Sequence, residues 1–237
     1  TLAFDPVTDS SLFTAHPSPE GQAKLSYVTP LQWLTPDAKL TLSTSGVVQQ
    51  QRSDCTAVGV DPVTGLCTGQ VFGNGFNVTA WAVDGFAMLD VWGFNFVAYG
   101  YTGKGVGTEG LFFAGIDQFG EARRSDGGYL QAAYTFGNWF PNGQTLTVGA
   151  SYGVSRLDSA GTADTAAIDA QCFAFIDTTS PLNNCLVKEN KSWIGFARYK
   201  LTKWVNLQAE YVSTTAEDQV GQTVHDNAII AGTTFFW

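Results

Sequence analysis

The sequence predicts an all-β protein, an antiparallel transmembrane β-barrel with about nine or ten strands in this stretch of chain. Apolar and small polar residues alternate at period two over many segments, as in strands with one apolar face. Only 14% of the 237 residues are charged, against about 25% in ordinary soluble domains, while 44% are hydrophobic. The connections between the segments also alternate in length, short then long. Residues 1–237 are expected to form a single barrel domain.

The first four expected strands cover residues 23–34, 38–51, 75–83 and 87–101. These four segments, and the later segments 192–201 and 227–237, alternate less cleanly than the other three. Segment 87–101 carries aromatic residues on both faces, so we expect it to pack on both sides, against a neighbouring protomer or an inward-folded loop.

The other five expected strands cover residues 130–136, 145–155, 192–201, 205–211 and 227–237. The apolar face of segment 145–155 comprises Leu146, Val148, Ala150, Tyr152 and Val154. Its other face holds only Gly, Ser and Thr. The last segment alternates as far as an aromatic carboxy-terminal residue.

Short connections are expected at 35–37, 84–86, 137–144 and 202–203, and long ones at 52–74, 102–128, 156–191 and 214–226. In a meander of nine strands, all the long connections leave from one side. Outer-membrane barrels have this asymmetry, with short periplasmic turns and long extracellular loops.

A soluble sandwich or lipocalin-like barrel would also alternate, with its apolar face turned inward. Two features favour the membrane barrel. Gly, Ser, Thr, Gln and Asn fill the polar faces, in place of the Lys and Glu that coat soluble sheets. Aromatic residues gather at the strand ends nearest the short turns, where an interfacial girdle is expected; they are Trp139, Phe140, Trp204, Phe235 and Trp237.

Four cysteines fall into two close pairs, Cys55 with Cys67 and Cys172 with Cys185, each in an expected long loop. Two loop disulfides, and so an oxidising compartment, are the favoured interpretation. A zinc site is disfavoured because neither histidine lies near a pair.

No catalytic, cofactor-binding or metal-ligating residues are predicted, and we expect the protein not to be an enzyme. The glycine-rich run at 103–108 lacks the spacing of a phosphate-binding loop. Nucleic acid is an improbable partner because 12 basic residues face 21 acidic ones.

Three stretches closely resemble the second half of the Gram-negative general porins: residues 101–117 (YTGKGVGTEGLFFAGID), 124–137 (RSDGGYLQAAYTFG) and 146–155 (LTVGASYGVS). The run from Gln208 to Tyr211 and the terminal Phe-Phe-Trp resemble the last two strands of that family. The resemblance implies a sixteen-stranded barrel of the bacterial outer membrane, usually trimeric, in contact with lipid and lipopolysaccharide. It also implies a lumen that passes small hydrophilic solutes.

Strand counting adds a constraint to this resemblance. With a periplasmic carboxy terminus, the first expected strand descends, and an even-stranded barrel then needs at least one ascending strand before it. We therefore expect amino-terminal strands beyond those present here. The alternative is a closed ten-stranded barrel with a much narrower lumen.

Candidate pore-lining residues follow from the same alternation. If Trp193, Ala197 and Tyr199 face lipid, the lumen receives Arg198 and Lys200 from one strand and Gln208 and Glu210 from the next. Opposed charges across a constriction orient polar solutes and set ion preference. The alternative is a local salt bridge that braces the wall. Arg123 and Arg124, in an expected loop, could line the mouth, bind lipopolysaccharide phosphates or remain solvated.

The expected function is passive diffusion of small hydrophilic solutes and ions through a water-filled lumen. A net charge of -9 favours a mild preference for cations. Two alternatives remain: a substrate-specific channel, and a structural or adhesive outer-membrane barrel subunit in a larger complex.

Overall fold

Nine strands form one antiparallel sheet in the computed structural model, which describes residues 20–52, 77–106, 115–116, 121–137, 143–162, 164–166 and 187–235. The strands are β1 (Gly21–Pro30), β2 (Lys39–Arg52), β3 (Asn77–Val91), β4 (Phe94–Lys104), β5 (Arg124–Phe136), β6 (Thr145–Leu157), β7 (Val187–Lys200), β8 (Val205–Asp218) and β9 (Thr223–Phe235). The predicted all-β antiparallel fold is confirmed. Within the described residues, no helix is long and apolar enough to cross a membrane.

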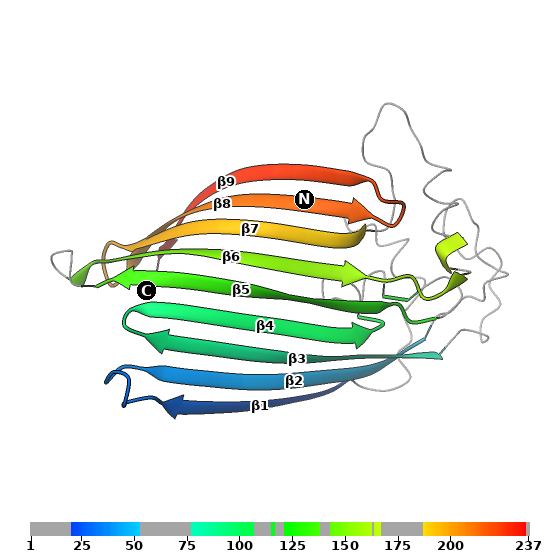
Figure 1. The fold of residues 1–237 in the computed structure, drawn as a ribbon, viewed down its shortest axis with the longest axis horizontal. Helices are drawn as coiled ribbons and strands as arrows, with labels where there is room; N and C mark the ends of the chain where they lie inside the picture. The colour runs from blue at the N-terminus through cyan, green and yellow to red at the C-terminus, as the bar shows by residue number, and fades with distance from the viewer. Residues whose placement is uncertain are drawn as a thin grey trace.

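The sheet is a simple meander, in which each strand pairs with its neighbours in the sequence, from β1 to β9. Figure 1 shows the curved sheet with β1 and β9 at opposite edges. These two strands do not pair within the described part of the chain, so the sheet is a partial barrel wall with two open edges.

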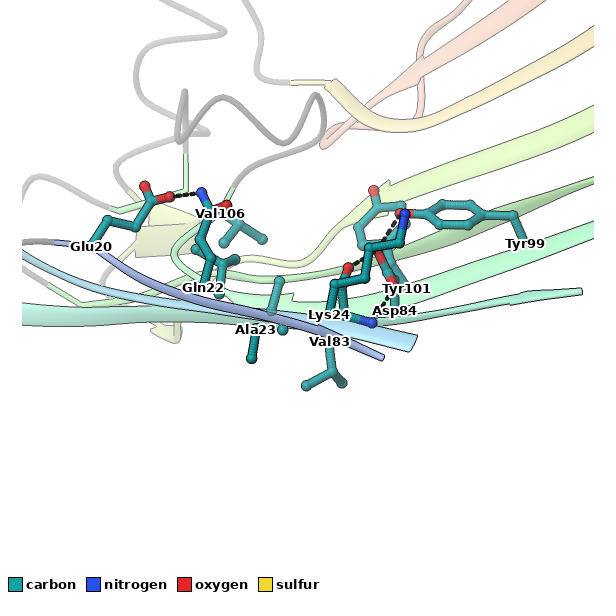
Figure 2. A pocket seen from close by; sticks show the side chains of 13 residues that line it. Glu20, Gln22, Ala23, Lys24, Val83, Asp84, Tyr99, Tyr101 and Val106 are labelled. Atoms are coloured by element: carbon teal, nitrogen blue, oxygen red, sulfur yellow. Dashed lines mark hydrogen bonds between the residues drawn. The ribbon is translucent and has the colours of Figure 1, made fainter. Parts of the chain in front are cut away.

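Cross-strand register assigns the side chains to two faces, because directly paired residues point to the same side of a sheet. We call the face with Asp84, Tyr99 and Arg198 the inner face, and the opposite one the outer face. In Figure 2, Tyr99 and Tyr101 lie on the side towards which the later strands curve, whereas Val83 points away.

The outer face is apolar over most of its height. One row of paired residues across it contains Tyr27, Leu42, Ala87, Ala98, Leu130, Tyr152 and Trp193, and continues to the polar residues Ser213 on β8 and Asn227 on β9. Leu130 in the middle of this row is 64% exposed, so the packing of the sheet does not cover it. A paired row on the inner face is mostly small or polar, and contains Ser26, Ser43, Phe86, Tyr99, Tyr129, Gly153, Ser192, Thr214 and Asp226.

Segment 87–101 is not one strand, and the predicted turn at 84–86 is wrong. β3 continues through Gly85 to Val91, and the chain reverses at Trp92 and Gly93, which have φ of 52° and 82°. Two successive positive φ values give the tight turn whose twist suits a hairpin. Apart from Trp92 in the turn, the aromatic residues of the segment all lie on β4, with Phe94 and Phe96 on the outer face and Tyr99 and Tyr101 on the inner face.

The connection expected at 214–226 is also mostly strand. β8 runs to Asp218 and β9 begins at Thr223, so only four residues connect them. The Asp218 carboxylate accepts hydrogen bonds from the amides of Val220 (3.1 Å) and Gln222 (2.7 Å), and Gly221 has φ of 85°. The other connections on this side, 53–76, 105–123 and 158–186, are long. We call this side of the sheet the loop end.

Candidate functional site

The inner face of the sheet is the candidate site, and its β7–β8 section contains the four predicted pore-lining residues. Arg198 pairs with Gln208 in the register, and Lys200 pairs with Asn206. A guanidinium nitrogen of Arg198 lies 4.0 Å from a carboxylate oxygen of Glu210, and Gln208 donates a 2.7 Å hydrogen bond to the same oxygen. The structure thus brings Arg198, Gln208 and Glu210 together on one face and leaves Lys200 outside these contacts.

The Phe196 ring contacts the Arg198 side chain. The guanidinium lies 4.8 Å from the centre of the Phe196 ring, within the range of a cation–π interaction. Phe196 is buried and lies across Gly149 of β6, because a Cβ added at Gly149 would be 2.5 Å from the Phe196 ring. This packing fixes the position of the Phe196 ring and so helps to position the Arg198 guanidinium on the inner face.

A second polar cluster lies on the inner face of β2, β3 and β4, closer to the loop end. The Asp84 carboxylate accepts hydrogen bonds from the Ser45 amide (2.8 Å), the Ser45 hydroxyl (2.7 Å) and the Tyr99 hydroxyl (3.5 Å). The hydroxyl of Tyr101 is 2.7 Å from that of Ser155 on β6. Sequence analysis did not identify this cluster.

The cluster lines a cavity of about 740 Å³ (Figure 2). Inner-face residues supply most of its strand lining: Gln22, Lys24, Ser45, Val47, Ala82, Asp84, Tyr99 and Tyr101. Glu20 lies at its edge and accepts a hydrogen bond from Gln22. The cavity therefore combines carboxylates, an ammonium group and phenol rings.

Charges of both signs are distributed over the inner face. Cations and carboxylates nearly balance along the described strands: Lys24, Lys39, Arg198 and Lys200 face the same side as Asp84, Asp90, Glu210, Asp218 and Asp226. Lys39 and Asp90 form an ion pair of 3.4 Å near the short turns. The net charge of the chain is therefore not concentrated on these inner positions.

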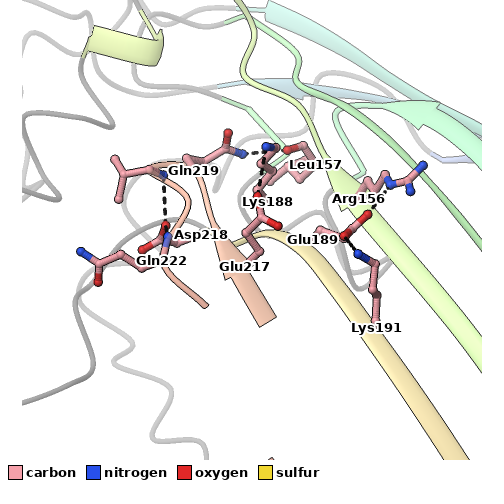
Figure 3. Close-up of polar contacts among 10 residues, drawn as sticks. Arg156, Leu157, Lys188, Glu189, Lys191, Glu217, Asp218, Gln219 and Gln222 are labelled. Carbon is pink, nitrogen blue, oxygen red and sulfur yellow. Dashed lines mark hydrogen bonds and ion pairs between the residues drawn. The ribbon is translucent and has the colours of Figure 1, made fainter. Parts of the chain in front are cut away.

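The outer face carries its charged residues only near the loop end of the described strands. They are Lys104, Arg124, Asp126, Arg156, Glu189, Lys191 and Glu217. Figure 3 shows Glu189 between Arg156 and Lys191, and it forms ion pairs with both, at 2.5 Å from Arg156. Lys188 and Glu217 form a further pair of 3.2 Å. We call this band the charged rim.

Arg123 and Arg124 lie in different environments. Arg124 is the exposed first residue of β5, so its expected place in a loop is wrong. Arg123 is buried and makes a two-pronged contact with Asp164, at 2.7 Å and 2.5 Å. Burial opposes ionisation of Asp164, yet hydrogen bonds from Arg123 and from the Ala160 amide hold its pKa below the ordinary aspartate value.

Two of the predicted girdle aromatics lie in the described residues. Trp204 lies in the 201–204 turn and Phe235 at the end of β9, both exposed on the short-turn side. Trp139, Phe140 and Trp237 lie outside the described residues, as do Cys55, Cys67, Cys172 and Cys185. The outer face adds a cluster that sequence analysis did not single out, in which the Tyr134 ring lies 4.6 Å from Phe94 and 4.7 Å from Phe136.

No group of three or more His, Cys, Asp or Glu side chains that could hold a metal ion occurs in the described ranges. No protein-family model matches the sequence, and a comparison with curated proteins finds no match. Among solved structures, the fold is similar to the crystal structure of the outer membrane channel DcaP of Acinetobacter baumannii, with a TM-score of 0.61 and 15% sequence identity.

That similarity covers 94% of this chain and 53% of the channel, so the chain spans about half of the channel's length. At this identity the likeness shows the fold. The sheet has a porin-like architecture, whereas membership of the general porins is still a prediction.

Proposed function

We propose that this chain forms part of the wall of an outer-membrane channel, through which small hydrophilic solutes and ions diffuse passively. One observation carries the proposal: the outer face is apolar and exposed up to a charged rim, while the inner face is mostly small or polar. A soluble sheet would cover its apolar face with a second layer. Lipid is the environment that stabilises an uncovered one.

The height of the apolar band supports this proposal. From Leu146 to Val154 on the outer face of β6, the strand rises about 27 Å at about 3.4 Å per residue. A strand tilt of about 40° leaves about 21 Å across the bilayer, close to the band of about 25 Å in outer-membrane barrels. Arg156 then follows at the level of the polar headgroups.

The two open edges, β1 and β9, imply that further strands complete the barrel. Unpaired backbone groups at an edge in lipid would each cost several kcal/mol. We propose that strands outside this stretch pair with β1 and β9, as the sixteen-stranded expectation requires. A mass well above 25.4 kDa for the natively extracted protein would support this, whereas a mass of 25.4 kDa would require completion by another copy or a smaller barrel.

Contact with lipopolysaccharide is part of the same proposal. Lys104 and Arg124 are direct partners across β4 and β5 on the outer face, and both are exposed. Like charges directly opposite one another are destabilising unless an anion bridges them. Replacing both residues with serine is expected to reduce lipopolysaccharide retained on purification, and unchanged retention would contradict this contact.

Ion conductance in a planar lipid bilayer tests the proposed function. We expect stepwise, ohmic conductance after insertion of the protein extracted from membranes in detergent. Folded, inserted protein that conducts no ions would contradict an open channel and would favour the structural or adhesive alternative.

A further inference from the structure

Three tyrosine rings form a continuous surface on the inner face of β4 and β5. The centre of the Tyr99 ring is 5.5 Å from that of Tyr129 and 6.3 Å from that of Tyr101, with interplanar angles of 32° and 34°. We call Tyr99, Tyr101 and Tyr129 the tyrosine platform. A row of aromatic rings on a face that is mostly small or polar offers apolar area to a solute.

Hydrogen bonds hold two of these rings in place. The Tyr99 hydroxyl donates to Asp84, and the Tyr101 hydroxyl is bonded to Ser155, so both phenols are anchored at their polar ends. Tyr129 is 39% exposed, which leaves part of its surface open on the inner side. Anchored rings lose little further conformational freedom when a ligand packs against them.

The polar groups beside the platform include both donors and acceptors. The cavity at its edge measures about 740 Å³, within the usual range of about 300–1,000 Å³ for small-molecule sites. Its wall contains the Lys24 ammonium and the Asp84 carboxylate on the same face, joined in register through Ser45. Lys24 is exposed and makes no ion pair with the other described residues.

These charges disfavour a strongly charged ligand. Asp84 already accepts three hydrogen bonds, and Lys24 would repel a cation, while Asp84 and Glu20 would repel an anion. A neutral, hydroxyl-bearing ring satisfies both kinds of polar group and presents an apolar C–H face to the phenol rings.

We propose that the tyrosine platform and the adjoining cavity form a binding subsite for pyranose saccharides on the inner wall. This inference rests on the proposed channel function and gives the channel a preferred solute class. A weak, open subsite would concentrate the solute and still release it, as conduction requires.

Maltotriose titration tests the subsite in two ways. In planar bilayers, maltotriose is expected to reduce the ion current saturably, whereas sorbitol, which has hydroxyls but no ring face, is expected to cause no saturable block. Isothermal titration calorimetry of the detergent-purified protein with maltotriose measures binding without any need for conductance. A protein that binds maltotriose but conducts no ions would contradict the proposed channel function and would still support the proposed subsite.

Four variants test which side chains contribute to maltotriose binding. Tyr129→Leu is expected to weaken maltotriose binding about fivefold, the loss of one aromatic contact. Tyr129→Phe keeps the ring and is expected to bind within about twofold of the unaltered protein. Tyr134→Leu removes an outer-face ring from the same strand and is expected to leave binding unchanged. Asp84→Asn is expected to weaken binding, because it removes an acceptor for a sugar hydroxyl.

Several outcomes would overturn the proposal. They are the absence of saturable maltotriose binding by folded protein, equal binding by Tyr129→Leu and the unaltered protein, and equal block by sorbitol. Tighter block by arginine or gluconate than by maltotriose would assign the site to cations or to anions instead.

Discussion

At the scale of single residues, the Arg198–Glu210 pair on the inner face has two possible roles. The side chains are 55% and 20% exposed and 4.0 Å apart, so water screens their attraction. Exposed pairs of this kind contribute about 0–1 kcal/mol to stability. The pair would therefore stabilise the sheet only weakly. A charge that points into a narrow aqueous path, in contrast, attracts or repels every ion that passes.

We predict that Arg198→Gln shifts the bilayer reversal potential towards cation preference and that Glu210→Gln shifts it towards anion preference. The unfolding free energy should change by less than about 1 kcal/mol in either variant. Arg156→Gln is the matched control, because Arg156 is 53% exposed but lies on the outer face. Equal reversal potentials for Arg198→Gln and Arg156→Gln would show that Arg198 serves only as a brace.

The Arg123–Asp164 ion pair, unlike the exposed Arg198–Glu210 pair, is buried, and the Asp164 side chain is 1% exposed. Because the folded-state pKa of Asp164 is lowered, its contribution to stability is fully present above the ordinary aspartate pKa of about 3.9. It is lost as the pH falls through the lowered value. We expect Asp164→Asn to destabilise this contact locally by about 3 kcal/mol.

Hydrogen exchange of the Ala160 amide, which donates to Asp164, measures this effect. The amide should exchange faster in Asp164→Asn at neutral pH, and in the unaltered protein only at strongly acidic pH. Asp158→Asn, at an exposed carboxylate nearby, is the control and should not change the exchange. Unchanged protection in Asp164→Asn would contradict a stabilising role for the pair.

At the scale of strands, glycines let β5, β6 and β7 approach closely on the inner face. A Cβ at Gly149 would lie 2.5 Å from the Phe196 ring and 2.7 Å from the carbonyl oxygen of Ala132. At Gly85 on the outer face, an added Cβ would meet nothing within 4 Å. We expect Gly149→Ala to destabilise the fold by about 1–3 kcal/mol and Gly85→Ala to have little effect.

The heat-modifiable mobility of the folded barrel in detergent gels measures this difference. Gly149→Ala should convert to the unfolded mobility at a lower temperature than Gly85→Ala. Equal conversion temperatures would contradict the close packing of Phe196 against β6.

The two faces of β5 also predict opposite responses to charge. Leu130 lies in the apolar band and Gln131 on the inner face. Leu130→Lys should cost about 2–4 kcal/mol and lower the yield of inserted protein. Gln131→Lys should insert normally, and equal yields from the two variants would contradict a lipid-facing outer surface.

Alternation in the sequence was enough to predict nine strands and their antiparallel order, but several boundaries were missed. β5 begins at Arg124 and β7 at Val187, both inside the expected long loops, and β1 ends at Pro30 instead of residue 34.

Two further differences have a clear physical reason. Asp84-Gly85 has the composition of a tight turn, yet the turn forms at Trp92 and Gly93. A residue with a side chain as bulky as that of Trp92 seldom adopts positive φ, so this turn was not expected. The end of β8 was assigned to a loop because Ser213, Thr214, Thr215 and Glu217 put polar side chains on both faces. This part of the strand passes beyond the apolar band and no longer alternates.

Alternation in the sequence also predicted part of the candidate site. Arg198 and Glu210 belong to strands joined by a short turn, so alternation alone indicated a shared face. The tyrosine platform needs the register between β4 and β5, which are separated by residues 105–123. A long connection does not fix register, so the contact between Tyr99 and Tyr129 could not be derived from the sequence.

At the scale of the whole molecule, the sheet is an asymmetric wall. Its loop end carries the charged rim and the cavity, and its other end carries short turns with exposed aromatics such as Trp204. Inner-face charges of the described strands are nearly balanced, so most of any cation preference would have to arise from residues outside them. We expect weak ion selectivity, and a strong preference for anions in reversal-potential measurements would contradict the expectation from net charge.

The most direct test of the central claim is thiol accessibility along β6 in lipid membranes, with the unaltered protein as background. Single cysteines at Ser151, on the inner face, and Ala150, on the outer face, differ by one position but point to opposite sides. A charged, water-soluble thiol reagent should modify Ser151→Cys rapidly and Ala150→Cys very slowly. Equal rates at the two positions, or faster modification of Ala150→Cys, would contradict a wall with water inside and lipid outside.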